Sequence, residues 1–224
     1  MEPRISLHAP KNNMHISTVG KSMEPVINGF RAHSVDRQVL LHSSGTADVA
    51  RKIKERIEAL VDRKICELRE VDPFDMNGIV GTILEVKNQF ADSDISVNIT
   101  GGTNIMASSA LLACSMIGGH AYYVKENKTE PNLSLKELVI DIPMPRVSIN
   151  EIGDKQKKII KFLSTRKGRV DSASIIAESV GGSPQIIGYH LAELREKKLI
   201  NIIPEGRRKI IILTNSGSLF ANMI

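Results

Sequence analysis

The sequence predicts an α/β domain with a Rossmann-like, mainly parallel sheet, followed by a small winged helix-turn-helix domain. Two observations support this prediction. Through the first 127 of the 224 residues, short β-branched runs alternate with helical patterns, and the alternation stops at Pro143-Met144-Pro145. The charge balance changes near the same point, since residues 1–149 carry 17 Lys and Arg against 18 Asp and Glu, whereas residues 150–224 carry 13 against 7. Such an asymmetry indicates a neutral module joined to one that binds a polyanion.

The strands and helices of the first part follow one another in regular alternation. Ser22 and Asp75 are the expected N-caps of two helices. Right-handed crossovers then place helices on both faces of a parallel sheet. Residues 135–142 are expected to add an antiparallel strand at one edge. The strands are expected at 15–19, 38–42, 65–71, 95–99 and 121–124, and the helices at 22–33, 46–61, 75–90 and 104–117.

The second part has a different order of elements, which is the layout of a winged helix-turn-helix domain. Three helices are expected at 155–164, 172–180 and 183–198, then a hairpin of 200–203 and 208–213 that turns at Pro204-Glu205-Gly206, and a last helix at 216–223. The predicted organisation is an N-terminal extension (1–13), a domain for ligand sensing and dimerisation (14–142), a linker (143–153) and a DNA-binding domain (154–224).

Composition excludes several classes of protein. A chain that is 42% hydrophobic and 25% charged is not intrinsically disordered. Five Phe, three Tyr and no Trp argue against a single-strand binder built on stacked aromatic side chains. Cys66 and Cys114 lie far apart, which argues against a disulfide or a thiolate zinc site and favours a reducing cytoplasm. The apolar stretch 105–124 is interrupted by Ser, Gly and His residues, so a buried helix and a buried strand are expected there instead of a membrane span.

The predicted helix 183–198 and the hairpin tip carry the candidate DNA contacts. Ile187, Leu191 and Leu194 recur at spacings of four and three, which assigns them to the packed face. The opposite face would enter the major groove, and the basic tip would lie beside the phosphate backbone. The alternatives are an ordinary solvated turn, or a winged helix that docks a protein or dimerises. The candidate DNA-binding residues are Ser183, Gln185, Tyr189, His190, Arg195, Arg207, Arg208 and Lys209.

A glycine-rich turn between a predicted strand and a predicted helix is the most informative segment. In Thr100-Gly101-Gly102-Thr103, glycines allow a ligand to approach the backbone, and Thr103 can cap the helix whose free N–H groups favour an anion. The turns Gly20-Lys21-Ser22 and Ser43-Ser44-Gly45-Thr46 follow neighbouring strands, at the edge where open parallel sheets bind ligands. The sequence has neither a G-x-x-x-x-G-K-[ST] motif nor a G-x-G-x-x-G motif. The alternative is that the glycines serve packing only.

Together with Met14-His-Ile-Ser-Thr-Val-Gly20 and the predicted winged helix, the segment Thr100-Gly-Gly-Thr-Asn-Ile-Met106 resembles the CARF (CRISPR-associated Rossmann-fold) family. The resemblance is strongest to archaeal regulators that join a CARF domain to a winged helix-turn-helix. It implies a homodimer that holds a cyclic oligoadenylate, usually cyclic tetra-adenylate, across its two-fold axis. No other cofactor, metal or membrane partner is expected. By position, the ligand-binding residues would be Gly20, Lys21, Ser22, Ser43, Ser44, Thr100, Gly101, Gly102, Thr103, Asn104 and Met106.

The leading hypothesis is therefore a transcription regulator whose affinity for double-stranded DNA responds to a cyclic oligoadenylate, and not an enzyme. Two alternatives stay open. Some proteins that resemble this family cleave their own cyclic ligand without a metal, so the chain is alternatively a ring nuclease. It is also alternatively a regulator that senses another small anion. Residues 1–13 precede the start that the resemblance implies, so they are either an extension or the result of a start codon assigned upstream of Met14.

Overall fold

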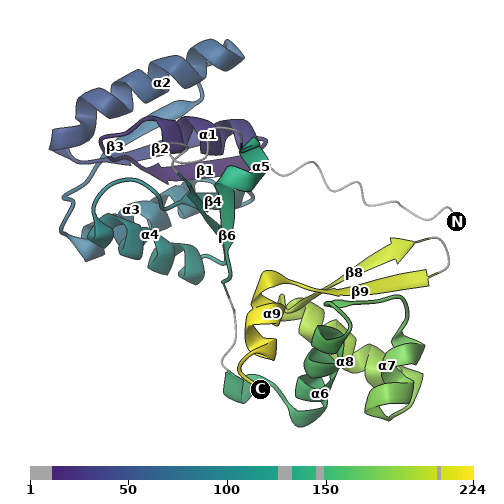
Figure 1. The fold of residues 1–224 in the computed structure, drawn as a ribbon. Coiled ribbons are helices and arrows are strands. Elements are labelled where there is room, and N and C mark those ends of the chain that lie inside the picture. Colours follow the sequence, from purple (N-terminus) through teal and green to yellow (C-terminus); the bar gives the residue numbers. More distant parts are fainter. Residues whose placement is uncertain (1–11, 126–132, 145–148, 206–207) are drawn as a thin grey trace, which may run out of the picture. The chain divides into compact units, whose positions relative to one another are not determined.

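The computed structural model describes residues 12–125, 133–144, 149–205 and 208–224. The chain divides into two compact units, residues 1–142 and residues 143–224 (Figure 1). We call them the first and the second unit and describe each by itself.

The first unit is built on a six-stranded sheet in the order β3-β2-β1-β4-β5-β6. All neighbouring strands are parallel except β5 and β6, which are antiparallel. The central position of β1 is visible in its register, where Ile16 lies between Val39 and Val97. The strands are β1 (Asn13–Thr18), β2 (Arg37–His42), β3 (Cys66–Glu70), β4 (Asp94–Asn98), β5 (His120–Val124) and β6 (Val139–Ile142).

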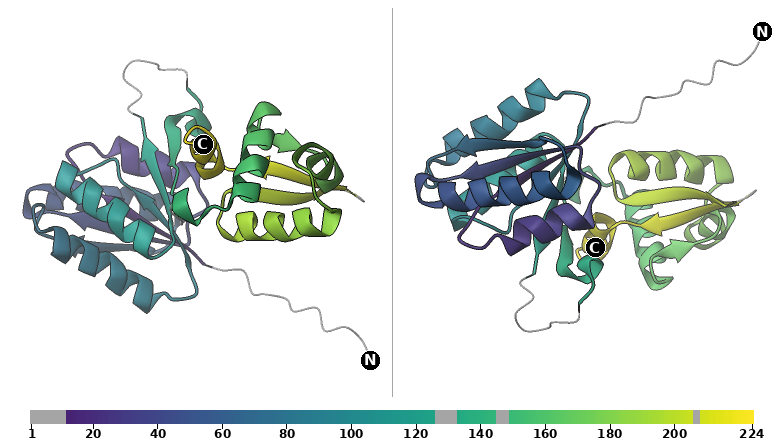
Figure 2. Two further views of the ribbon diagram at one scale, coloured as in Figure 1. Left: turned by 90° about the horizontal axis from the view of Figure 1, so that it is seen from below. Right: turned by 90° about the horizontal axis from the view of Figure 1, so that it is seen from above.

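Helices cover both faces of this sheet. Seen from above, α1 and α2 lie in front of the strands, and seen from below, α3 and α4 do (Figure 2). This division follows from the strand order, because the chain moves from β1 towards one edge and then returns to β4 on the other side of β1. The predicted fold class is confirmed. The helices are α1 (Glu24–Ala32), α2 (Ala47–Val61), α3 (Met76–Gln89), α4 (Asn104–Met116) and the single turn α5 (Leu135–Leu138), with a short 3₁₀ turn η1 (Ser44–Thr46) before α2.

Two predicted helix caps have different outcomes. The Asp75 Oδ1 atom accepts a hydrogen bond of 3.0 Å from the Gly78 N–H, so Asp75 caps α3 as predicted. The prediction that Ser22 caps α1 is wrong, since the N-cap position is occupied by Met23, which makes no side-chain capping bond. Pro25 in the first turn explains why the helix starts one residue later, because proline has no backbone N–H that a capping side chain would need to bind.

The edge strand begins four residues later than predicted. Residues 135–138 form the helical turn α5, and only Val139–Ile142 pair with β5. The N–H and the hydroxyl of Ser134 both donate to the Glu137 Oε2 atom, at 2.8 and 2.6 Å. This capping box stabilises a helical turn, and the Ser-x-x-Glu pattern is its sequence signal.

The sheet of the first unit also begins earlier than the predicted boundary at residue 14. β1 starts at Asn13, whose N–H donates to the Asp36 Oδ2 atom at 2.8 Å. The Asn12 carbonyl accepts a hydrogen bond of 3.1 Å from the Asp94 N–H. Residues 12 and 13 therefore extend the ladder between β1 and its neighbours.

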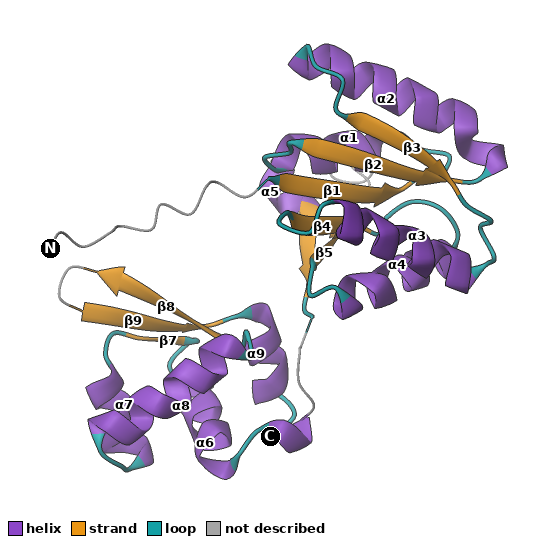
Figure 3. Ribbon diagram, turned by 180° about the vertical axis from the view of Figure 1, so that it is seen from behind, coloured by secondary structure: helices purple, strands orange, loops and turns teal. Residues whose placement is uncertain are grey.

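The second unit has the element order predicted for a winged helix. Helices α6, α7 and α8 pack together with the strands around one apolar core. The three-stranded sheet has the order β7-β9-β8 (Figure 3). The two-residue strand β7 was not predicted. Pro204 and Glu205 lie in β8, paired with Lys209 and Arg208, so the predicted turn begins later than expected. The elements are η2 (Ile149–Glu151), α6 (Asp154–Thr165), β7 (Arg169–Val170), α7 (Ala173–Val180), α8 (Pro184–Glu196), β8 (Ile200–Glu205), β9 (Arg208–Leu213) and α9 (Asn215–Ala221).

The two cysteines, possible metal ligands and the apolar helices can each be located in the structure. Cys66 and Cys114 are both buried and free. Within the described residues, no group of His, Cys, Asp and Glu side chains is arranged to hold a metal ion. In the same part of the chain, no helix is both long and apolar enough to cross a membrane.

A buried histidine lies in the sheet of the first unit. His15 is in β1, and its Nδ1 atom lies 3.2 Å from the Tyr122 hydroxyl. The His33 ring is 5.0 Å away between centroids, and His120 is also near. Burial, and then the neighbouring His33 and His120, lower the pKa of His15 to about 3. His15 is therefore neutral in the folded protein at neutral pH.

This histidine makes the first unit acid-sensitive. Below pH 6.5 the unfolded chain takes up a proton at His15 that the folded chain does not, so stability is lost as the pH falls from 6.5 towards 3. We expect His15→Gln, which keeps a polar partner for Tyr122 but does not titrate, to remove about 2 kcal/mol of the stability loss between pH 7 and pH 5. Urea unfolding at both pH values measures this, and an equal loss in the wild type and the variant would contradict it.

Candidate functional site

The carboxyl ends of β1 and β4 mark the topological switch point of the first unit. From β1 to β3 the strands are added towards one edge of the sheet, and from β4 onwards they are added towards the other edge. β1 continues into α1 on one face, and β4 continues into α4 on the other (Figure 1). In open α/β sheets, ligands bind at such a point because the two loops diverge. The turns after β1 and β4 are the Gly20-Lys21-Ser22 and Thr100–Thr103 segments that the sequence identified.

The two turns touch through their backbones. A Cβ atom on Gly101 would lie 2.3 Å from the Thr18 carbonyl oxygen and 2.7 Å from the Gly20 nitrogen. A Cβ atom on Gly20 would lie 2.8 Å from the Gly102 nitrogen. Gly102 has a φ of +79°, and its Cβ would lie 2.7 Å from the Met106 sulfur. Packing between the two turns is therefore enough by itself to require Gly20 and Gly101, and the positive φ and the contact with Met106 require Gly102.

The threonine hydroxyls of the motif are used inside the protein. The Thr100 hydroxyl donates to the Asn98 Oδ1 atom at 2.6 Å and accepts from the Val124 N–H at 2.7 Å. The Thr103 hydroxyl donates to the Pro73 carbonyl at 2.8 Å and accepts from the Met106 N–H at 3.1 Å. The Thr100 bonds fix the turn against β5, and the bond from Thr103 to Pro73 fixes it against the loop after β3. The bond that Thr103 accepts from Met106 caps α4.

Asn98, which was not predicted as a site residue, is almost completely buried at the end of β4. Its amide nitrogen donates to the Pro25 carbonyl at 3.0 Å, and its Oδ1 atom accepts from the N–H and the hydroxyl of Thr100. Asn98 therefore joins the beginning of α1 to the turn before α4. An asparagine directly after the buried Val97 of a central strand is the sequence signal for such a buried bond.

The groups that remain accessible at this edge are few. Lys21, Ser44, Gly102 and Asn104 are exposed, and the Lys21 side chain makes no hydrogen bond or ion pair within the described part of the chain. The first turn of α4 has no acidic residue, so its N–H groups favour an anion. Gly20, Ser22, Ser43, Thr100, Gly101 and Thr103 are half-buried, and Met106 is buried in the core.

The turn after β2 is held by its own side chains. The Thr46 Oγ1 atom accepts from the Ser43 N–H at 3.1 Å and lies 3.3 Å from the Ser43 Oγ atom. Ser43 is thus engaged in η1, and of the two predicted serines only Ser44 is an exposed residue.

Helix α4 is not buried on all sides, so the prediction of a buried helix within 105–124 is wrong. Ile105, Leu112 and Met116 are exposed, the last two at 48% and 61%. They recur at spacings of seven and four, which places them on one side of the helix. α4 packs its other side on α3 and the sheet. We call this exposed row the α4 stripe.

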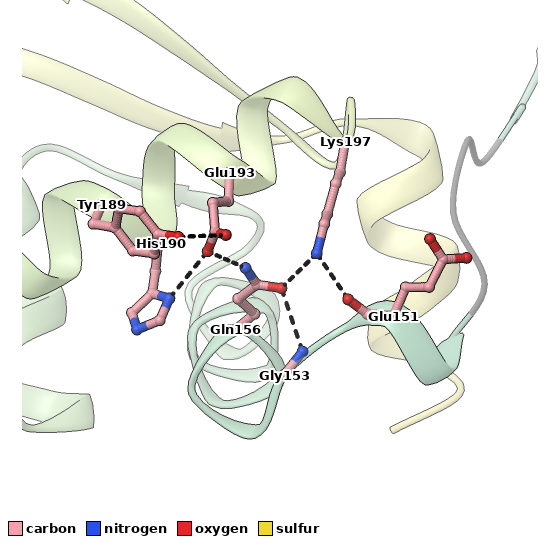
Figure 4. Close-up of polar contacts among 7 residues, drawn as sticks. All are labelled: Glu151, Gly153, Gln156, Tyr189, His190, Glu193 and Lys197. Atoms are coloured by element: carbon pink, nitrogen blue, oxygen red, sulfur yellow. Dashed lines mark hydrogen bonds and ion pairs between the residues drawn. The ribbon is translucent and has the colours of Figure 1, made fainter.

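A polar cluster connects α8 to α6 in the second unit (Figure 4). The buried Gln156 of α6 donates to the Glu193 Oε2 atom at 2.7 Å and accepts from Lys197 Nζ at 3.0 Å. Lys197 also donates to the Glu151 carbonyl of η2 at 2.8 Å. The Tyr189 hydroxyl donates to the Glu193 Oε1 atom at 3.0 Å, which lowers the pKa of Glu193 and raises that of Tyr189.

The predicted DNA contacts fall in three places. Ser183 caps α8 by accepting from the Ile186 N–H at 3.3 Å. His190 is half-buried against the polar cluster, with its Nδ1 atom 3.4 Å from the Glu193 Oε2 atom and without a hydrogen bond. Arg207 lies outside the described residues. The remaining candidates are exposed, on α8 or at the start of β9: Gln185, Tyr189, Arg195, Arg208 and Lys209.

The fold defines the class of protein: a Rossmann-like domain whose strand order reverses at the β1–β4 edge, joined to a unit with the element order of a winged helix. Residues 13–129, just over half of the chain, match the family model "HFX_2341_N:-like, N-terminal". The chain belongs to this family. No curated protein matches it in sequence.

Several solved structures are similar to the chain, among them the following three. Can2 from Sulfobacillus thermosulfidooxidans, in complex with cyclic tetra-adenylate, is 13% identical with a TM-score of 0.46, over 93% of this chain and 61% of Can2. Csm6 from Enterococcus italicus, bound to cyclic hexa-2′-fluoro-hexa-dAMP, is 13% identical with a TM-score of 0.49, over 83% of this chain and 55% of Csm6. MepR, a transcription regulator of the Staphylococcus aureus multidrug efflux pump MepA, is 25% identical with a TM-score of 0.31, over 33% of this chain and 56% of MepR. The chain spans less than two thirds of each of these proteins.

The contact between the two turns predicts a strong effect of one methyl group. We expect Gly101→Ala to destabilise the first unit by about 1–3 kcal/mol, because the added carbon overlaps the Thr18 carbonyl. Gly45→Ala is the matched control, since its Cβ would meet only the Ser43 Oγ atom at 3.8 Å. Thermal and urea unfolding measure both variants. Equal stability of the two variants would contradict the contact.

Proposed function

We propose that this protein is a transcription regulator that binds a cyclic oligoadenylate, most specifically cyclic tetra-adenylate, at the β1–β4 edge and double-stranded DNA through its second unit. The observation that carries the proposal is the meeting of two turns: the glycines after β1 and β4 touch, next to the first turn of α4 and to the exposed Lys21, whose side chain makes no hydrogen bond or ion pair within the described residues. The motif that resembles the CARF family, Thr100–Met106, contains the second of these turns and the start of α4.

The ligand is held chiefly by dipoles. Residues 1–149 carry a net charge of −1, from 17 Lys and Arg and 18 Asp and Glu, so no general positive field attracts a phosphate to the first unit. Backbone N–H groups at a helix N-terminus bind phosphate without a net charge, and Lys21 adds one point charge. A ligand with few, well-spaced phosphates fits this arrangement.

The α4 stripe supports a homodimer. A two-fold-symmetric ring is matched by a two-fold pair of identical sites, each contacting one half of the ligand. Ile105 of the stripe follows Asn104 at the exposed start of α4, so an apolar contact along α4 lies next to the proposed site. The proposed interface is therefore continuous with the proposed site.

The second unit is proposed to bind DNA by charge at its hairpin and by contacts from α8. Residues 150–224 carry 13 Lys and Arg against 7 Asp and Glu. Arg208 and Lys209 are exposed on β9 beside the hairpin tip. Ligand binding then changes DNA affinity by about 1–3 kcal/mol, and DNA changes ligand affinity by the same amount.

Lys21 provides the test of the ligand site. We expect Lys21→Ala to weaken binding of cyclic tetra-adenylate by about tenfold or more, because a charge-assisted bond to phosphate is lost. Lys52→Ala, an exposed lysine on α2, is the matched control and keeps wild-type affinity. Calorimetry gives both affinities and an expected stoichiometry of one ring per two chains. Absence of heat with rings of four and six nucleotides would exclude this ligand class.

The hairpin provides the test of DNA binding. We expect the double variant Arg208→Ala and Lys209→Ala to weaken binding equally on all duplexes and to reduce the salt slope by about one unit per lost phosphate contact. The double exchange Arg208→Lys and Lys209→Arg keeps both charges and should keep the slope. Fluorescence anisotropy across a salt series measures both. An unchanged slope in the alanine variant would remove the hairpin from the DNA interface.

A further inference from the structure

The first turns of α8 present an uncharged surface. Residues 183–192 contain no Lys, Arg, Asp or Glu. Gln185 and Ile186 are exposed, and Ile186 has 51% of its surface accessible although it is aliphatic. The Gln185 amide makes no hydrogen bond within the described residues. A primary amide and a branched alkyl group are therefore the groups that the beginning of this helix offers to a partner.

Tyr189 adds an aromatic ring to this surface and not a free hydroxyl. It is 63% exposed, but its hydroxyl donates to Glu193, whose other oxygen is bound by the buried Gln156 (Figure 4). Because the acceptor is itself fixed to α6, the hydroxyl is directed along α8. The ring then lies beside Gln185 and Ile186 on the outer side of the helix.

Gly188 lies in the same two turns, and the second unit gives no reason for it. A Cβ atom there would meet nothing within 4 Å, and its φ is not positive. A glycine inside a helix costs about 1 kcal/mol relative to alanine. Its effect is a flat surface over the backbone between Gln185 and the exposed Ala192, which allows close approach from outside.

We infer that α8 recognises A·T base pairs in the major groove, with the Gln185 amide on an adenine and the Ile186 side chain on a thymine methyl group. This inference rests on the proposed DNA-binding function. Adenine presents an acceptor and a donor, N7 and N6, that match a primary amide, and only thymine presents a methyl group. Guanine presents two acceptors that are most often bound by Arg or Lys, and cytosine presents a donor that suits Asp or Glu. None of these four side chains occurs in residues 183–192.

Four duplexes of equal length distinguish recognition in the major groove from recognition in the minor groove. The full-length protein is titrated with alternating A·T, A·U, G·C and I·C duplexes, each of about 24 base pairs, at constant salt. A·U lacks the thymine methyl group. I·C has the major groove of G·C but lacks the guanine amino group in the minor groove, so it resembles A·T there. We expect A·T to bind at least about tenfold more tightly than G·C, A·U to bind about three- to tenfold more weakly than A·T, and I·C to bind as weakly as G·C.

Two variants assign the contacts. In Ile186→Ala the ratio of A·T to A·U affinity should fall to about one, while Gln185→Ala should reduce the preference for A·U over I·C. Ile175→Ala, an exposed isoleucine at the start of α7, is the matched control and should keep the wild-type ratios. All three side chains are exposed, so circular dichroism should show unchanged folding.

The outcomes are distinct. Equal affinity for A·T and G·C would overturn the inference while leaving DNA binding in place. I·C binding as tightly as A·T would also overturn it, since the preference would then come from the minor groove. Binding to none of the four duplexes would overturn the proposed function and the inference with it.

Discussion

The close approach of two backbone turns is the constraint on which the first unit depends. β1 and β4 are neighbours, yet the helices that follow them lie on opposite faces of the sheet. Their turns must therefore pass each other just beyond the carboxyl ends of the two strands. Gly20 and Gly101 allow this, because any side chain at either position would overlap main-chain atoms. The start of α4 and the position of Lys21 follow from that contact. The candidate site thus exists because the topology reverses there.

The polar side chains of this edge serve the fold before they serve a ligand. Asn98 and Thr100 bind to each other and to the backbone of α1 and β5, and Thr103 binds the loop after β3. What faces outward is mostly backbone. An anion site made this way in a unit without net positive charge differs in kind from the second unit, where exposed cations beside the hairpin are suited to a polyanion.

In the second unit, one buried amide organises the surface. Gln156 accepts from Lys197 and donates to Glu193, and so fixes α8 against α6, while Lys197 itself donates to the Glu151 carbonyl of η2. Glu193 is engaged internally, as is the Tyr189 hydroxyl. The charged and hydrogen-bonding groups of the middle of α8 therefore point towards the protein, and the beginning of the helix is left neutral.

The sequence by itself determined the fold class, the position of most strands and helices, the cap at Asp75 and the glycine turn, because periodicity and capping chemistry are local. It also identified Lys21 as the cation near that turn. Only the tertiary structure decided that Thr100 and Thr103 are bonded internally, that Asn98 joins α1 to β4, and that the α4 stripe is exposed. The physical reason is that these features depend on partners distant in sequence, such as Val124 for Thr100, Pro73 for Thr103 and Pro25 for Asn98. The sequence reads the same whether a threonine hydroxyl faces a carbonyl or solvent. An apolar helix face is buried only where another element covers it.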